Sequence, residues 1–272
     1  MLNSMGPTTK KIFVMPHLLL ATSTALLSGC AAVYVPTTPG TPLLEKGQVE
    51  VRAGVRSFRY AEAGAAWSPV AHVLLTGEVA GSTGSTTVTD AQGRTVEYEE
   101  VYGQGSVGLG LYRAPTARRR TYLAAMGGIG WGHTKFFAYD DYQPASVFFP
   151  FPLPTRSGVY DARYRRYYGQ VYFAGPADEK ARQFGASLRA VWLDYTRLTY
   201  ADQPIVPANR VFVEPSVFWR FGRGALRCYA TGGLSLPVHV DPANPANART
   251  ASWSYLFGGG LILRPDLLRH RE

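Results

Sequence analysis

The sequence predicts an all-β fold, a closed antiparallel up-and-down barrel of about ten strands, with eight strands as the alternative. Three features predict it: apolar and polar residues alternate with a period of two from Gln48 onward, the alternating stretches are long, and the connections between them alternate in length. The composition agrees, because 46% hydrophobic and 13% aromatic residues exclude a disordered chain. An excess of glycine and proline, 29 and 19 residues, favours many turns and little helix.

Ten stretches carry the alternation. Most exceed the roughly five or six residues typical of soluble sheets and reach the about 9 to 11 residues that a tilted strand needs to cross a bilayer. No apolar run after the first thirty residues is long enough for a membrane-spanning helix, so a helical membrane protein is excluded. The candidate strands are 48–57, 59–67, 71–82, 98–113, 120–135, 160–174, 181–199, 208–221, 226–238 and 250–263.

The connections alternate between short turns and long polar or proline-rich loops, apart from a tight hairpin at 57–58. The short ones are 68–70, 114–119, 175–180 and 222–225, and the long ones are 83–97, 136–159, 200–207 and 239–249. This order is expected of a membrane barrel whose short turns face the periplasm and whose long loops face outward. With ten strands, both chain ends lie at the short-turn end.

One face of each predicted strand is apolar and the other is polar or charged, and in a membrane barrel the apolar face meets lipid. The charges of the other face, four acids and six bases, then point into the lumen. They are Glu50, Arg52, Arg56, Glu62, Glu78, Arg166, Arg189, Glu214, Arg220 and Arg227. Paired arginine and glutamate would fill a narrow lumen as a polar core; the alternative is a narrow pore that prefers anions.

The tryptophans fall at two levels of the predicted strands. Trp67 and Trp219 lie beside short turns, whereas Trp131, Trp192 and Trp253 lie toward the long loops. This distribution is typical of the two aromatic girdles of a membrane barrel. The alternative is that bulky aromatic residues cap strand ends.

The amino terminus has the pattern of an export signal: Lys10 and Lys11, then an apolar run, then Leu27-Ser28-Gly29-Cys30. The last four residues resemble the lipobox of bacterial lipoproteins. The resemblance implies cleavage between Gly29 and Cys30 and attachment of diacylglycerol and palmitate to Cys30, and Ala31 permits sorting to the outer membrane. Residues 1–29 are then the signal peptide, and 30–47 a linker that holds Cys30 beside the inner leaflet. An ordinary signal peptide is the alternative.

The final strand, the ten alternating stretches and the lipobox together resemble bacterial outer-membrane β-barrel proteins, here of a lipid-anchored kind. Gly258, Leu261 and Leu263 match the spacing of the insertion signal in that group, but Leu256 replaces its polar residue, and the charged tail 265–272 replaces a terminal aromatic residue. The resemblance implies a barrel over 48–264 and an outer-membrane location. It also implies outer-membrane lipids, the barrel-assembly machinery and the lipoprotein-sorting machinery as partners.

Charge and cysteine content exclude several other classes. Without residues 1–29 the chain has 26 basic and 19 acidic groups, a net charge of +7, and the basic residues are spread over strands and turns instead of clustering as in nucleic-acid binders. With Cys30 lipidated, Cys228 has no disulfide partner. No cofactor or metal site is predicted, because His72, His133 and His239 lie on different strands without ligand spacing.

The segment 136–159 is rich in aromatic residues and proline. As an exposed loop it would present an apolar patch and is a candidate binding loop, with Phe136, Phe137, Tyr139, Tyr142, Phe148, Phe149 and Phe151 as its aromatic residues. Three alternatives are open: it folds over or into the barrel mouth, it binds a partner outside, or its flanks lengthen the adjoining strands.

The predicted function is therefore that of a lipid-anchored outer-membrane barrel with an occluded lumen, a structural or surface-binding role and no catalysis. Its ligand is not predicted. The alternatives are a narrow passive pore for small solutes or anions, a hydrolase at the outer rim, and a tethered soluble β-sandwich. The hydrolase would depend on His133, Asp140 and Asp141, which are the acids and histidine predicted nearest the outer rim.

Overall fold

A computed structural model describes residues 33–89, 95–118, 120–143, 153–207, 209–238, 250 and 252–268. It contains ten long strands: β1 (Val49–Arg56), β2 (Tyr60–Trp67), β3 (Val73–Thr89), β4 (Thr95–Arg113), β5 (Tyr122–Gln143), β6 (Leu153–Ala174), β7 (Arg182–Tyr200), β9 (Val211–Phe221), β10 (Leu226–Pro237) and β12 (Gly258–Leu263). Two two-residue strands, β8 (Gln203–Pro204) and β11 (Ser254–Tyr255), and a short 3-10 helix, η2 (Pro265–Leu267), complete it. Within these ranges no helix is long and apolar enough to cross a membrane.

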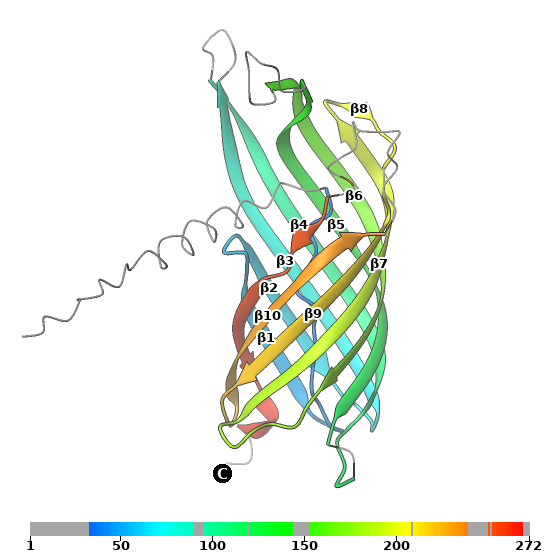
Figure 1. Cartoon of the computed structure of the whole chain (residues 1–272), viewed down its shortest axis with the longest axis vertical. Helices are drawn as coiled ribbons and strands as arrows, with labels where there is room; N and C mark the ends of the chain where they lie inside the picture. The colour runs from blue at the N-terminus through cyan, green and yellow to red at the C-terminus, as the bar shows by residue number, and fades with distance from the viewer. Residues whose placement is uncertain are drawn as a thin grey trace, which may run out of the picture. The chain divides into compact units, whose positions relative to one another are not determined.

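The long strands form one closed ring (Figure 1). β1 pairs with β2 along one edge and with β12 along the other, and the ring continues from β2 through β7 to β9, β10 and β12. All of these pairs are antiparallel, and closure leaves no long strand with an unpaired edge. The ten-stranded barrel is therefore confirmed, and the eight-stranded barrel and the two-sheet sandwich are wrong.

Two connections predicted to be long loops are largely strand. β3 and β4 stay paired up to Thr89 and Thr95, and β5 and β6 up to Gln143 and Leu153. These extensions lack a strict apolar alternation because neither face there has to meet lipid. Adjacent strands still satisfy each other's backbone groups, and residues rich in threonine, valine and aromatic rings favour strand. The last predicted strand, 250–263, is wrong as a single element, since Leu256 and Phe257 separate β11 from β12.

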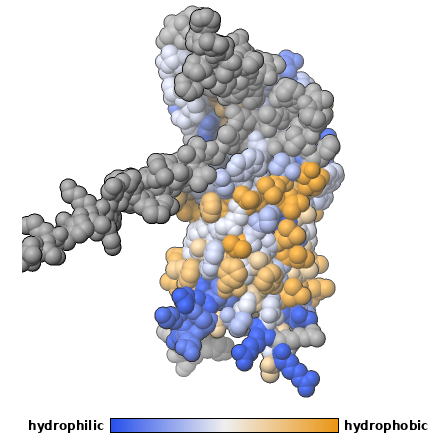
Figure 2. All heavy atoms as spheres, viewed as in Figure 1, coloured by the Kyte–Doolittle hydropathy of each residue, from blue (hydrophilic) through white to orange (hydrophobic). Residues whose placement is uncertain are grey.

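Apolar side chains face outward and charged side chains face inward, the reverse of a water-soluble barrel. In β1, Val51 and Val55 are 39% and 51% exposed, whereas Glu50 and Arg56 are each only 3% exposed. On the face shown in Figure 2, apolar residues form a belt across the barrel wall, with hydrophilic residues at its short-turn end, and the exposed valine, leucine and tryptophan side chains of the other strands extend this belt. This distribution suits a barrel surrounded by hydrocarbon.

The five tryptophans are all exposed on the outside of the barrel wall or its rim. Trp67 and Trp219 lie at the short-turn ends of β2 and β9, and Trp192 lies near the long-loop end of β7. Trp131 lies well inside β5, because that strand runs on to Gln143. It therefore does not cap a strand end, which favours an aromatic girdle at this level.

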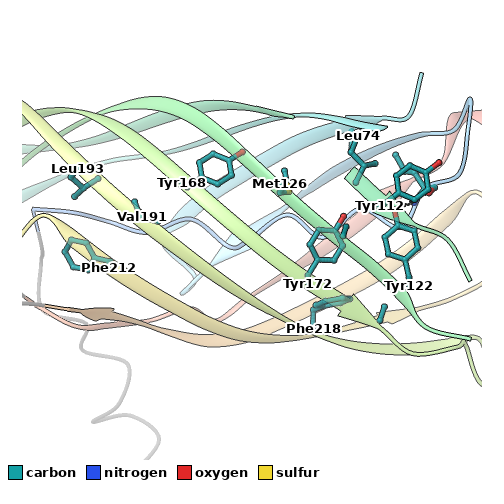
Figure 3. Close-up of a cluster of buried hydrophobic side chains, with 14 of the residues drawn as sticks. Leu74, Tyr112, Tyr122, Met126, Tyr168, Tyr172, Val191, Leu193, Phe212 and Phe218 are labelled. Carbon is teal, nitrogen blue, oxygen red and sulfur yellow. Dashed lines mark hydrogen bonds between the residues drawn. The ribbon is translucent and has the colours of Figure 1, made fainter. Parts of the chain in front are cut away.

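The short-turn end of the lumen is closed by a layer of tyrosines (Figure 3). The rings of Tyr112 and Tyr122 stack with centroids 5.5 Å apart, and Tyr122 stacks on Tyr172 at 6.2 Å. The Tyr112 hydroxyl lies 3.0 Å from Ser68 Oγ in the β2–β3 turn. The interior thus begins, at this end, as an aromatic core.

Candidate functional site

The lumen is filled by the chain's own N-terminal segment. Residues Val33–Gly47, called here the plug segment, precede β1, and most of them are buried inside the ring. The predicted linker over 30–47 is therefore, in its described part, an element of the barrel interior. The physical reason is that the lumen contains more arginine than glutamate, and the plug segment supplies backbone oxygens to the surplus.

At the short-turn end, the plug segment is held by the tyrosine layer and by a turn. The Gly47 amide donates to the Ser68 carbonyl at 2.7 Å. Leu44 is completely buried, and its carbonyl accepts a hydrogen bond from the Tyr122 hydroxyl at 3.2 Å. The Tyr172 hydroxyl donates to the Pro42 carbonyl at 2.7 Å.

In the middle of the lumen, arginine side chains donate to backbone carbonyls of the plug segment. Arg52 reaches Thr38 O at 3.1 Å, Arg189 donates to Thr37 O, and Arg220 donates to Thr41 O. Carbonyl dipoles thus solvate three guanidinium groups, of which those of Arg189 and Arg220 are buried and that of Arg52 is partly buried. This lowers the cost of burying cations that outnumber the lumen carboxylates.

The four lumen glutamates each pair with an arginine. The shortest nitrogen–oxygen distances are 2.5 Å for Arg189–Glu214, 2.7 Å for Arg52–Glu78, 2.8 Å for Arg220–Glu50 and 3.1 Å for Arg56–Glu62. Arg220 holds Glu50 through two nitrogens, a bidentate geometry that fixes both side chains. Arg227 differs from the others, because it is half-buried near the short-turn end and donates to Gly224 O at 3.2 Å.

Two of these glutamates also accept hydrogen bonds from backbone amides of the plug segment. Thr38 N donates to Glu62 at 3.1 Å, and Gly40 N donates to Glu78 at 3.0 Å. The plug segment therefore presents donors to the acids and acceptors to the bases. Both acidic and basic side chains of the lumen are therefore hydrogen-bonded to the plug segment.

At the long-loop end, the start of the plug segment enters a second apolar cluster. Val33 is completely buried with Phe136, Tyr160 and Tyr200, which lie toward the long-loop ends of β5, β6 and β7. The next residue, Tyr34, donates to Glu214 at 3.0 Å and packs on Phe212 with ring centroids 4.7 Å apart. The plug segment thus runs through the whole lumen, from the long-loop mouth at Val33 to the short turns at Gly47.

The local sequence suits this path. Pro36, Pro39 and Pro42 recur at every third position, a spacing that favours an extended chain without internal hydrogen bonds, whose carbonyls stay free for other donors. Gly40 lies close to the lumen charges, since a Cβ there would meet the Glu78 carboxylate, which would have to move, and would lie 3.3 Å from Arg52 Nη2. In the sequence, the signal for this path is the proline spacing next to strands whose inward face is rich in arginine.

Two small cavities lie beside the plug segment. A cavity beside Gly40, Thr41 and Pro42 has a volume of about 20 Å³, and a second beside Val35 and Phe136 has about the same volume. Each has room for about one water molecule. Along the described chain, neither of these cavities forms a passage for a solute.

The predicted aromatic binding loop is mostly not a loop. Phe136 and Phe137 lie in β5 and are 4% and 8% exposed, with Phe136 stacked on Tyr160 at a centroid distance of 5.2 Å. The backbone at Tyr139 and Tyr142 belongs to β5 as well. Phe148, Phe149 and Phe151 lie outside the described residues. Of the three alternatives, the lengthening of the adjoining strands accounts for the described residues.

The three residues proposed for a rim hydrolase do not form one site. His133 and Asp140 are seven residues apart on the same strand, which separates them by about 23 Å, and Asp141 lies one residue further on. His133 instead pairs with Asp161 of β6 at 3.2 Å, and Arg197 of β7 pairs with the same carboxylate at 3.2 Å. This cluster is at least partly exposed and belongs to the outer side of the wall, because His133 alternates with the buried Gly132 and Thr134.

The remaining predicted sites are placed as follows. Cys228 is exposed on the outer side of β10, and Gly29 and Cys30 lie outside the described residues. Among the described residues, no group of three or more histidine, cysteine, aspartate or glutamate side chains is arranged to hold a metal ion.

No protein-family model and no curated protein sequence matches the chain. Among solved structures, the outer membrane protease OmpT from Escherichia coli aligns with 80% of this chain and 93% of that chain, at a TM-score of 0.46 and 11% sequence identity. A likeness of this degree says nothing about what this chain does.

Proposed function

We propose that the protein is a sealed outer-membrane barrel, lipid-anchored at Cys30, that has a structural or surface-binding role and conducts no solute. The observation that carries the proposal is the plug segment, whose backbone bonds to the lumen charges along the whole barrel. A lumen filled in this way has no free charged lining with which to select ions.

The apolar belt supports the outer membrane as the location. Closed barrels are one of the two structures that can span a bilayer, because closure satisfies every backbone group inside the sheet. The outward valine and leucine side chains, with tryptophan on the wall at two levels, match the wall of such a barrel.

The lipid anchor is supported by the sequence Leu27-Ser28-Gly29-Cys30. Incorporation of labelled palmitate by cells expressing the full chain tests it. Label in the wild type that is lost in Cys30→Ala is the expected result, and equal label in both chains would contradict the anchor.

Conductance in a planar bilayer separates the sealed barrel from the pore. We expect the mature chain to be silent, and a chain that starts at Lys46, and so lacks most of the plug segment, to conduct with a preference for anions, since six arginines and four glutamates would then line the lumen. A synthetic peptide of residues 31–47 should suppress that conductance. Heat-modified gel migration shows whether the shortened chain has folded.

Steady conductance by the mature chain, unaffected by added peptide, would contradict the sealed barrel and favour the pore. Where the shortened chain does not fold, Gly40→Val in the full chain provides the second variant, because it forces the plug segment away from Glu78. Silence of a folded shortened chain would equally contradict the role given to the plug segment.

A further inference from the structure

We propose that the mature N-terminus leaves the barrel at the long-loop mouth, so that the lipid on Cys30 is delivered to the cell-surface side of the outer membrane and not to the periplasmic side. This inference rests on the lipid anchor of the proposed function. It places that anchor on the cell-surface side of the membrane, whereas the sequence pattern alone places Cys30 beside the inner leaflet.

The direction of the plug segment follows from the order of its contacts. Going from Gly47 toward Val33, the chain meets Ser68 in a short turn, then Tyr122 and Tyr172, then Arg220. After these it meets Glu78 and Glu62, then Arg189, and finally Glu214 and the cluster of Phe136, Tyr160 and Tyr200. The contacts therefore run from a short turn at Gly47 to the long-loop ends of β5, β6 and β7 at Val33.

The end points of this crossing lie at opposite ends of the barrel. Ser68 follows the last residue of β2 in a short turn, whereas Tyr200 is the last residue of β7 before a long connection. Short turns face the periplasm in barrels of this kind, and long connections face the exterior. Val33, packed beside Tyr200, therefore marks the exterior end.

Chain length limits where Cys30 can go. Three residues further along the chain from Val33 span at most about 10 Å even when fully extended. A second passage of chain beside Gly40, Thr41 and Pro42 or beside Val35 has no room, because the cavity at each place holds about one water molecule. A return along the outside would place unpaired backbone in hydrocarbon.

This arrangement does not require a lipid to be threaded through a closed ring. The plug segment continues directly into β1, and the ring is closed by the pairing of β1 with β12 over Val51–Arg56 and Gly258–Leu263. The segment can therefore be laid into the open sheet before this last seam forms. Gly258 leaves room at the seam, since a Cβ there would lie 2.7 Å from Thr38 Oγ1 of the plug segment.

The test is side-specific labelling of intact cells that express the full chain. A Cys228→Ser background carries one new cysteine, Ala32→Cys beside the plug segment, and is treated with a membrane-impermeant maleimide. Thr89→Cys, at the exposed long-loop end of β3, is the cell-surface control, and Lys180→Cys, in the β6–β7 turn, is the periplasmic control. The background without a new cysteine corrects for any label on Cys30. If Ala32→Cys impairs folding, a Gly-Cys-Gly insertion between Ala32 and Val33 replaces it.

We expect Ala32→Cys to label on intact cells to at least half the extent of Thr89→Cys, while Lys180→Cys labels only after the outer membrane is permeabilised. Labelling of Ala32→Cys only after permeabilisation, or only after denaturation, would overturn the inference. Palmitate incorporation measured on the same cells keeps the two proposals apart. Loss of palmitate with surface labelling refutes the anchor alone, and palmitate with periplasmic labelling refutes the exit alone.

Discussion

At the scale of single residues, Thr37 shows how the lumen accommodates its surplus of positive charge. Its carbonyl accepts from Arg189, and its hydroxyl lies 3.0 Å from Arg166 Nη1. Both arginines are fully buried. The hydroxyl and the carbonyl of Thr37 thus each accept a hydrogen bond from a buried arginine. They supplement the four lumen glutamates, which are outnumbered by the lumen arginines.

We expect Glu214→Gln to destabilise the folded barrel strongly. Glu214 is fully buried and accepts from Arg189 at 2.5 Å and from Tyr34 at 3.0 Å, so its neutralisation removes the nearest counterion of a buried guanidinium and leaves it only Glu78, at 3.9 Å. Breaking such a pair costs roughly 3–5 kcal/mol. The midpoint of urea unfolding in lipid vesicles measures this loss of stability.

Glu99→Gln is the matched control. The Glu99 side chain is 70% exposed and lies 3.9 Å from Lys135, so its replacement should change stability by less than about 1 kcal/mol. Equal midpoints for the two variants would contradict the buried pair.

We expect Gly40→Val to lower the stability of the barrel by roughly 1–3 kcal/mol, the usual effect of overpacking an interior. The new side chain would collide with Glu78 and crowd Arg52. Gly103→Val in β4 is the control, because nothing lies within 4 Å of a Cβ at that position. The same unfolding measurement applies, and a Gly40→Val midpoint at or above that of Gly103→Val would show that the plug segment does not pass there.

At the scale of elements, the β5–β6 hairpin has two parts with different roles. The part nearer the short-turn end lines the lumen with Tyr122, Met126 and Tyr164. The part nearer the long-loop end, called here the upper hairpin, continues the pairing as far as Gln143 and Leu153. Phe136, Ala138 and Tyr160 of this hairpin belong to the cluster that surrounds Val33.

Replacing residues 139–157 by a two-residue Asn-Gly turn should therefore leave the barrel folded. The turn joins Ala138 to Gly158, which are already partners in the antiparallel register, and Asn-Gly favours a tight hairpin. We expect heat-modified migration and bilayer silence to be retained. A shortened chain that folds but conducts would show that the upper hairpin, and not the plug segment, seals the lumen.

At the scale of the whole molecule, the apolar belt and not the lipid should hold the protein in the membrane. A closed barrel with an apolar wall remains inserted without a second anchor. We expect both the wild type and Cys30→Ala to stay in the outer-membrane fraction after an alkaline wash, and to show separate folded and unfolded bands on a gel run with and without heating. Release of Cys30→Ala by the wash, with no mobility difference, would mean that the barrel wall is not inserted.

The strand pattern by itself determined the barrel. A wall with lipid on one side and polar groups on the other leaves a period of two in the sequence, as in Val51 and Val55 against Glu50 and Arg56. Short turns and strand number follow from the same pattern. The alternating pattern does not reveal the part of β5 beyond Trp131 toward the long-loop end. There the strand continues through 136–143, and neither face has to be uniformly apolar.

Only the tertiary structure decided what fills the lumen and where the N-terminus points. Apart from the spacing of their prolines, residues 33–47 have no alternation of apolar and polar residues that reveals burial, because their backbone, more than their side chains, makes the contacts. Those contacts join residues up to 180 positions apart, as in Tyr34 and Glu214. A local pattern cannot encode such pairing, because the partners come together only when the sheet assembles around the segment.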